Sequence, residues 1–79
     1  MTVRVRLFAA LRELAGTSRA EVGGRTVGDV ADALSAIHGE RFARIVEVSS
    51  FVVNGERATR ATVVADDDEV AILPPVSGG

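Results

Sequence analysis

Apolar and arginine residues alternate along residues 2–8 with a period of two. The apolar positions are Val3, Val5 and Leu7, and the positions between them are Arg4 and Arg6. This alternation predicts a β-strand with one buried face, because successive side chains of a strand point to opposite sides of the sheet. Phe8 comes next and falls on the arginine side.

The following segment predicts a short helix and a second strand. Residues 9–15 suit a helical turn, and Gly16 can end it because glycine readily adopts a left-handed conformation. Residues 17–22 predict a strand with Ser18, Ala20 and Val22 on one face. A turn at Gly23-Gly24-Arg25 follows.

Residues 26–39 predict the main helix. Thr26 is the expected N-cap, and Asp29 three residues later resembles the acidic member of a capping box. His38 and Gly39 close the helix. Its apolar stripe has helical spacing and consists of Val27, Val30, Ala31, Leu34 and Ile37.

The second half of the chain predicts shorter elements. Residues 40–47 form a short helical or irregular packing segment, and residues 51–53 form a strand that runs into the tight-turn pair Asn54-Gly55. Residues 57–59 return as a short strand. After a turn at residues 66–68, residues 69–73 form the last strand, and Pro74-Pro75 ends it because proline donates no ladder hydrogen bond.

This order of elements predicts an α+β fold in which one main helix lies across one face of a mixed sheet. We expect a domain over residues 1–73 and an extended tail over residues 74–79. The expected core between helix and sheet is Val3, Val5, Leu7, Val27, Val30, Leu34, Ile37, Val70 and Ile72. The opposite face should then carry a partner-binding cluster of Phe8, Ala71 and Leu73, with Arg4 and Arg6 at its rim.

Composition narrows the function. The 79 residues contain no cysteine and no lysine, and their formal net charge is −2. Disulfides, zinc-thiolate sites and catalytic or phosphate-loop lysines are therefore excluded, and nucleic acid or anionic membrane is not an expected partner. The chain shows no signal-peptide pattern and no apolar run near the roughly 18 residues of a membrane span, so we expect a cytoplasmic protein.

The body of the chain offers no catalytic arrangement. His38 is expected to cap a helix end, and the aspartates 66–68 lack the alternating ligand spacing of a calcium loop. Gly23, Gly24 and Gly28 match neither a dinucleotide-binding fingerprint nor a phosphate loop. We predict a turn and a helix-packing glycine there, and no metal site.

The C-terminal residues leave two interpretations open: an ordinary frayed tail with chance glycines, or a segment with a function of its own. Two prolines favour an extended backbone, and two terminal glycines lack a Cβ and can enter a narrow cleft. The segment reads Pro74, Pro75, Val76, Ser77, Gly78 and Gly79. It would present a terminal carboxylate on a thin stalk.

Two segments together resemble the small, sulfur-carrying subunit of molybdopterin synthase, a family with the ubiquitin-like β-grasp fold. The first is Leu7-Phe8-Ala9-Ala10-Leu11-Arg12-Glu13-Leu14-Ala15-Gly16. The second is Val53-Asn54-Gly55-Glu56, followed after the acidic turn by Asp68-Glu69-Val70-Ala71-Ile72-Leu73-Pro74-Pro75-Val76-Ser77-Gly78-Gly79.

The resemblance implies that this chain is a carrier subunit without an active site of its own. An activating enzyme would use ATP to adenylate the Gly79 carboxylate, and a sulfur donor would convert it to a thiocarboxylate. The large synthase subunit, in a heterotetramer of two small and two large chains, would move the sulfur onto a cyclic pyranopterin precursor of the molybdenum cofactor. Gly78 would allow insertion, and Pro74, Pro75, Val76 and Ser77 would line the tunnel.

Three alternatives stay open at this point. The carriers that feed thiamine-thiazole or cysteine synthesis share the fold and a similar ending, although Pro74-Pro75 favours the molybdopterin family. A ubiquitin-like modifier would instead join Gly79 to lysines of other proteins. A plain β-grasp binding module would make no chemical use of the tail.

Overall fold

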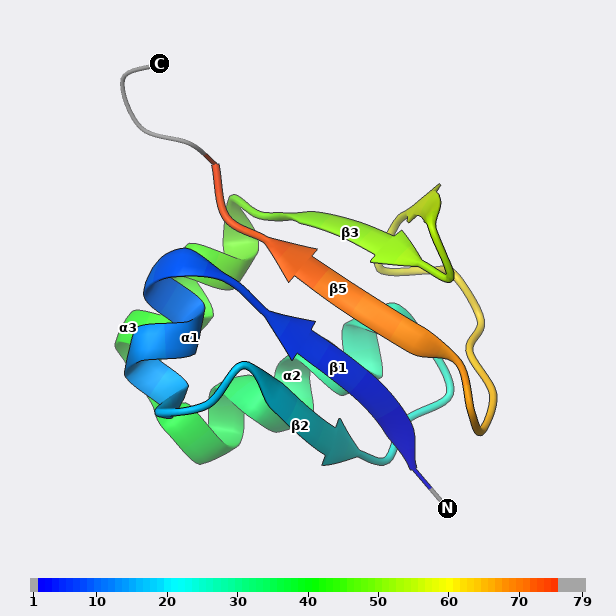
Figure 1. Ribbon diagram of the computed structural model, residues 1–79, viewed down its shortest axis with the longest axis horizontal. Coiled ribbons are helices and arrows are strands. Elements are labelled where there is room, and N and C mark those ends of the chain that lie inside the picture. The colour runs from blue at the N-terminus through cyan, green and yellow to red at the C-terminus, as the bar shows by residue number, and fades with distance from the viewer. Residues whose placement is uncertain (1, 76–79) are drawn as a thin grey trace.

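The computed structural model describes residues 2–75, which form one five-stranded sheet and three helices (Figure 1). The strands are β1 (Val3–Leu7), β2 (Arg19–Val22), β3 (Ser50–Val53), β4 (Glu56–Ala58) and β5 (Glu69–Leu73). Their order across the sheet is β2-β1-β5-β3-β4. The central pair β1–β5 is parallel and all other pairs are antiparallel, so the sheet is mixed, as predicted.

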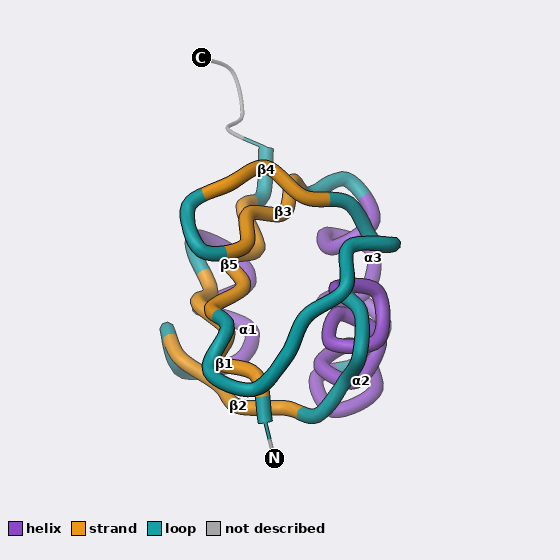
Figure 2. The backbone as a smooth tube through the Cα atoms, turned by 90° about the vertical axis from the view of Figure 1, so that its right-hand side faces the viewer, coloured by secondary structure: helices purple, strands orange, loops and turns teal. Residues whose placement is uncertain are grey.

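The helices are α1 (Ala9–Ala15), α2 (Val27–His38) and α3 (Glu40–Glu47). Helices α2 and α3 lie on one side of the sheet (Figure 2), and α1 lies at one end of the sheet, beside α3 (Figure 1). Helix α2 is the longest and packs against α3, and α1 also contacts α3. The other face of the sheet carries no helix among residues 2–75, and it is the face turned toward the reader in Figure 1. We call it the open face.

The core fills the space between the sheet and the helices. Eight of the nine predicted core residues are buried there: Val3, Val5, Leu7, Val27, Val30, Leu34, Val70 and Ile72. The prediction for Ile37 is wrong, because this side chain is 66% exposed. Phe42 of α3 is fully buried and packs with the ring of His38, and this aromatic side chain closes the core beyond the last turn of α2.

The predicted element boundaries are largely confirmed. Residues 40–47 form a regular helix, Gly16 ends α1 with φ of 75°, and β4 begins one residue earlier than expected. Strand β2 begins at Arg19 and not at residue 17, so Ser18 lies outside it, while Ala20 and Val22 share one face, as predicted. No helix among the described residues has both the length and the apolar character that a membrane crossing requires.

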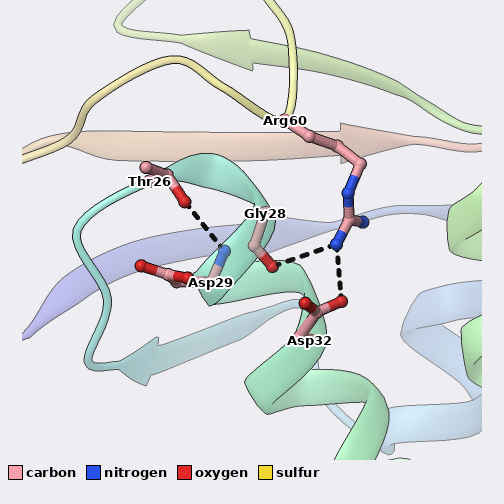
Figure 3. Close-up of polar contacts among 5 residues, drawn as sticks. All are labelled: Thr26, Gly28, Asp29, Asp32 and Arg60. Carbon is pink, nitrogen blue, oxygen red and sulfur yellow. Dashed lines mark hydrogen bonds and ion pairs between the residues drawn. The ribbon is translucent and has the colours of Figure 1, made fainter.

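The start of α2 is fixed by its cap and by a loop that approaches it from the second half of the chain (Figure 3). The backbone N–H of Asp29 donates to Thr26 Oγ1 at 3.1 Å, as the sequence predicted. Arg60 donates through Nη2 to Asp32 Oδ1 at 2.6 Å, and its carbonyl accepts from the N–H of Gly28 at 2.9 Å. A Cβ on Gly28 would lie 3.1 Å from that carbonyl oxygen, so Gly28 permits the close approach.

A second polar cluster joins the β3–β4 turn to the start of β5. Asn54 and Gly55 both have positive φ, as a tight hairpin turn requires. Asn54 Nδ2 donates to Asp68 Oδ1 at 2.9 Å, and Asn54 Oδ1 accepts from the N–H of Glu69 at 3.0 Å. The acidic turn is therefore a structural connection between the β3–β4 hairpin and the start of β5.

We expect this cluster to make the stability of the fold sensitive to acid. Hydrogen bonds from the backbone N–H of Ala65 and then from the Asn54 amide hold the pKa of Asp68 below its usual value of 3.8. A depressed native pKa gives stabilisation that is present above the unfolded-state pKa and is lost as the pH falls through the native one. We expect Asp68→Ala to be less stable than wild type at pH 7 and the difference to shrink progressively below pH 3.8.

Thermal melts of both proteins from neutral to acid pH test this expectation. Asp66→Ala in the same turn is the matched control and should follow the wild-type curve. A stability difference for Asp68→Ala that is the same at every pH would show that its ionised form is not what the cluster stabilises.

Candidate functional site

The candidate site is the end of β5, where the chain leaves the sheet. Strand β5 is central, with β1 on one side and β3 on the other, and its last residue Leu73 pairs with Ser50. Pro74 is half-buried and Pro75 is exposed. The chain thus departs from the middle of the sheet, and neither proline can extend the ladder with a donated hydrogen bond. Val76, Ser77, Gly78 and Gly79, which the sequence assigns to the tail, lie outside the described residues.

The three apolar residues predicted for partner binding lie together beside this exit. Phe8 has extended dihedral angles, φ −131° and ψ 156°, so the alternation of β1 continues through it to the open face. Leu7 pairs with Ile72, and one step further along the same parallel register sets Phe8 beside Leu73. Ala71 lies on the same face, and all three side chains are half-buried. We call Phe8, Ala71 and Leu73 the exit patch.

The two predicted rim arginines occupy different places. Arg6 is level with Ala71, and its guanidinium carbon lies 5.9 Å from the centre of the Phe8 ring, so it adjoins the exit patch. Arg4 is level with Glu69, at the other end of β5, where its Nη2 donates to the carbonyl of Asp67 at 2.9 Å. The structure therefore joins Arg6 to the exit patch and leaves Arg4 away from it.

Two open-face residues near the exit patch were missed by the sequence reasoning. Arg19 of β2 pairs with Arg6, and Val52 of β3 pairs with Ala71. Their presence on strands was readable from the sequence. Their position opposite Arg6 and Ala71 was not, because pairing register depends on the turns and on packing between distant segments.

The remaining polar candidates have structural roles. The His38 ring packs on the Phe42 ring at 5.0 Å between centres, and Asp68 holds the turn described above. Within residues 2–75, no three side chains of the metal-ligating types gather closely enough to hold an ion. The described residues thus place the exit patch beside the point at which the chain leaves the sheet.

Comparison with known proteins identifies the family. The ThiS family matches residues 5–79, which is nearly the whole chain. This chain belongs to the ThiS family. Solved structures of relatives share its ubiquitin-like β-grasp fold, which confirms the predicted fold class.

Relatives within this ThiS-family group carry different names. Small archaeal modifier protein 1 of Haloferax volcanii is 40% identical over 84 residues, covering 94% of this chain and 97% of the relative. The molybdopterin synthase sulfur carrier subunit of Arabidopsis thaliana is 37% identical over 83 residues, covering 98% of this chain and 82% of the relative. A chain in the crystal structure of the Amycolatopsis orientalis BexX/CysO complex is 30% identical, with coverages of 98% of this chain and 99% of that chain and a TM-score of 0.81.

Proposed function

We propose that this ThiS-family chain is the sulfur-carrier subunit of a molybdopterin synthase and that the terminal carboxylate of Gly79 carries the sulfur. The observation that supports the proposal most strongly is the departure of the chain from the central strand β5, through Pro74 and Pro75, beside the exit patch. Likeness to the Arabidopsis thaliana sulfur carrier subunit over 98% of this chain points to the same pathway.

The proposed chemistry converts the Gly79 carboxylate, a poor electrophile, into a thiocarboxylate whose sulfur is a nucleophile. In the first step the Gly79 carboxylate attacks the α-phosphorus of ATP, which gives an acyl-adenylate and releases pyrophosphate. Sulfide sulfur from a donor then attacks the acyl carbon, and the C–O bond to AMP breaks. The product is a thiocarboxylate, whose ionised sulfur is held on a protein. ATP is used by the activating enzyme, and this chain supplies only the carboxylate.

Two partners would use the same face of this chain in turn. The activating enzyme needs the Gly79 carboxylate in its nucleotide site, and the large synthase subunit needs the thiocarboxylate beside the pterin precursor. A partner that covers the exit patch would hold the base of the tail and direct residues 76–79 into its own cleft. The Amycolatopsis orientalis relative was solved in a complex, which supports a stable partner subunit for this fold.

A second candidate is protein modification. The Haloferax volcanii relative, 40% identical, is named a modifier. The acyl-adenylate would form in the same way, but a lysine amine would then take the acyl carbon and leave an isopeptide bond. This chain contains no lysine, so it could be joined to other proteins but could not receive a copy of itself on a lysine side chain.

One reconstitution separates these functions. Thiocarboxylated chain is mixed with a large synthase subunit and the cyclic pyranopterin precursor, and the pterin product is followed by mass spectrometry. We expect transfer of two sulfurs per pterin from two copies of the chain. Sulfur transfer to a thiazole or cysteine precursor, with none to the pterin, would assign another carrier pathway, and Gly79 remnants on lysines of cellular proteins would favour the modifier.

The exit patch provides a test of partner docking. We expect Phe8→Ala and Leu73→Ala to weaken binding to the large subunit or to the activating enzyme by about tenfold or more, since truncation of a central apolar anchor costs about 2 kcal/mol. Both side chains are half-buried in the free chain, so thermal melts should shift less than binding does. Calorimetric titration and melts measure the two effects.

Ile37→Ala is the matched control, because Ile37 is an exposed apolar residue on α2, on the helix side of the sheet. It should bind like wild type. Wild-type affinity in both patch variants would remove the exit patch from the docking surface.

A further inference from the structure

The open face carries two rows of charged residues that differ in how their charges are balanced. In the first row Arg4 of β1 lies between Glu21 of β2 and Glu69 of β5. Its guanidinium also donates to the carbonyl of Asp67 at 2.9 Å. Arg4 therefore has opposite charges on both sides, an arrangement that stabilises neighbouring strands.

In the second row no acidic residue stands directly opposite an arginine, although Glu21 and Glu69 of the first row line the same hollow. Arg6 of β1 faces Arg19 of β2 on one side and Ala71 of β5 on the other. Like charges directly opposite each other on paired strands are destabilising. The ion pairs found within residues 2–75 use Arg44 and Arg60, so neither arginine of this row is neutralised by them.

Arg6 also has an unused donor. Its Nε is buried and has no hydrogen-bond partner within the described part of the chain. A buried N–H without an acceptor costs free energy, because its bond to water is lost and not replaced. The Phe8 ring, 5.9 Å from the guanidinium carbon, offers its π-face but no acceptor atom.

We propose that Arg6 and Arg19 together bind a carboxylate side chain, Asp or Glu, of the protein partner that docks on the open face. A carboxylate has two oxygens and accepts hydrogen bonds from two guanidinium groups. One acidic side chain would therefore accept the hydrogen bond from Arg6 Nε and reduce the repulsion between the two positive charges. That this partner is the activating enzyme or the large synthase subunit rests on the proposed function.

A protein carboxylate fits this place better than a free anion because of what lies beside it. Arg6 adjoins Phe8 and Ala71 of the exit patch, so apolar and positive groups form one continuous surface. Protein interfaces combine such an apolar centre with charged groups nearby. The chain as a whole has a net charge of −2, so this row is a local exception rather than part of a general attraction for anions.

The first experiment uses the isolated chain and observes the arginine Nε–H signals by ¹⁵N–¹H NMR at low ionic strength. The probe is the peptide acetyl-Glu-Glu-amide, with acetyl-Lys-Lys-amide and inorganic phosphate as comparisons. We expect a saturable shift of the Arg6 Nε–H signal with the glutamate peptide and none with the lysine peptide. In Arg19→Gln the affinity should fall by about fivefold, which is the effect of a charge pair worth about 1 kcal/mol.

Arg41→Gln is the matched control, because it changes the net charge equally but lies on α3, on the helix side of the sheet. It should leave the titration unchanged. The same affinity in wild type and Arg19→Gln, or no shift of Arg6 Nε–H, would overturn the proposal. Binding of phosphate that is as tight as that of the peptide would also overturn it, in favour of a free-anion site.

The melting temperature distinguishes a pair of arginines that binds a partner from a pair that stabilises the fold. Because Arg6 and Arg19 repel each other, Arg19→Gln should melt at the same temperature as wild type or higher. A clear loss of stability in Arg19→Gln would show that the pair supports the fold instead. None of these measurements depends on the C-terminal tail. The carboxylate-binding proposal can therefore be tested even if Gly79 turns out not to carry sulfur.

Discussion

Removal of Gly79 is expected to abolish sulfur loading and to leave the fold intact. The chemistry needs the carboxylate of a glycine that a partner can draw into a narrow cleft, and deletion moves the carboxylate to Gly78, one residue short. The buried apolar residues of the described chain all lie between Val3 and Ile72, so the core does not depend on the last residue. Intact mass after activation and a thermal melt measure the two effects.

Adding one residue after Gly79 should be as harmful as the deletion, because the reactive carboxylate then belongs to another residue. One residue added before Met1 is the matched control and should load normally. A chain without Gly79 that still delivers sulfur to the pterin would contradict the assignment of the carrier atom.

Truncation of Leu34 to alanine is expected to produce the largest loss of stability among simple substitutions in α2. Leu34 is 1% exposed and faces the sheet, and removal of a buried leucine side chain costs about 2–5 kcal/mol. The total stability of small domains is about 5–15 kcal/mol, so this variant should lose a large part of it. Denaturant titration gives the free energy of unfolding directly.

Ile37→Ala provides the contrast within the same helix. Ile37 was predicted to share the buried stripe, but the structure leaves it 66% exposed, so its truncation should change stability by no more than about 0.5 kcal/mol. Equal losses in the two variants would show that the helix packs on a different face from the one described.

The fold was predictable from the sequence wherever a local rule decided the structure. The alternation around Arg4 and Arg6, the Thr26 cap and the Asn54-Gly55 turn each depend on neighbouring residues, and each is confirmed. Ile37 was misplaced because helical spacing gives the side of a helix but not the point at which the core ends. That point is set by Phe42, which reaches the core from a separate helix.

The candidate site was predictable in part for the same reason. The alternation of side chains along each strand was enough to predict that Phe8 and Leu73 share one face. The pairing of strands across the sheet was needed to show that Arg4 lies away from the exit patch and that Arg19 lies opposite Arg6. Register between distant strands is decided by packing and turn geometry together, and a single segment does not contain it. The proposed role of Gly79 depends on the family resemblance, since spacing and charge indicate only an extended terminal carboxylate.

The relatives of this ThiS-family chain carry names from different functions. Modifier, molybdopterin and CysO names occur among proteins that align with almost the whole chain. If activation of the terminal glycine is common to them, the final acceptor is chosen by the partner and not by the carrier body.

The most direct test of the sulfur-carrier proposal is the intact mass of the chain after incubation with an activating enzyme, ATP and a sulfur source. The proposal predicts a mass increase equal to replacement of one oxygen by one sulfur, located on Gly79 by fragmentation and dependent on ATP. An unchanged mass, under conditions in which the same enzyme loads its own carrier, would contradict the proposal.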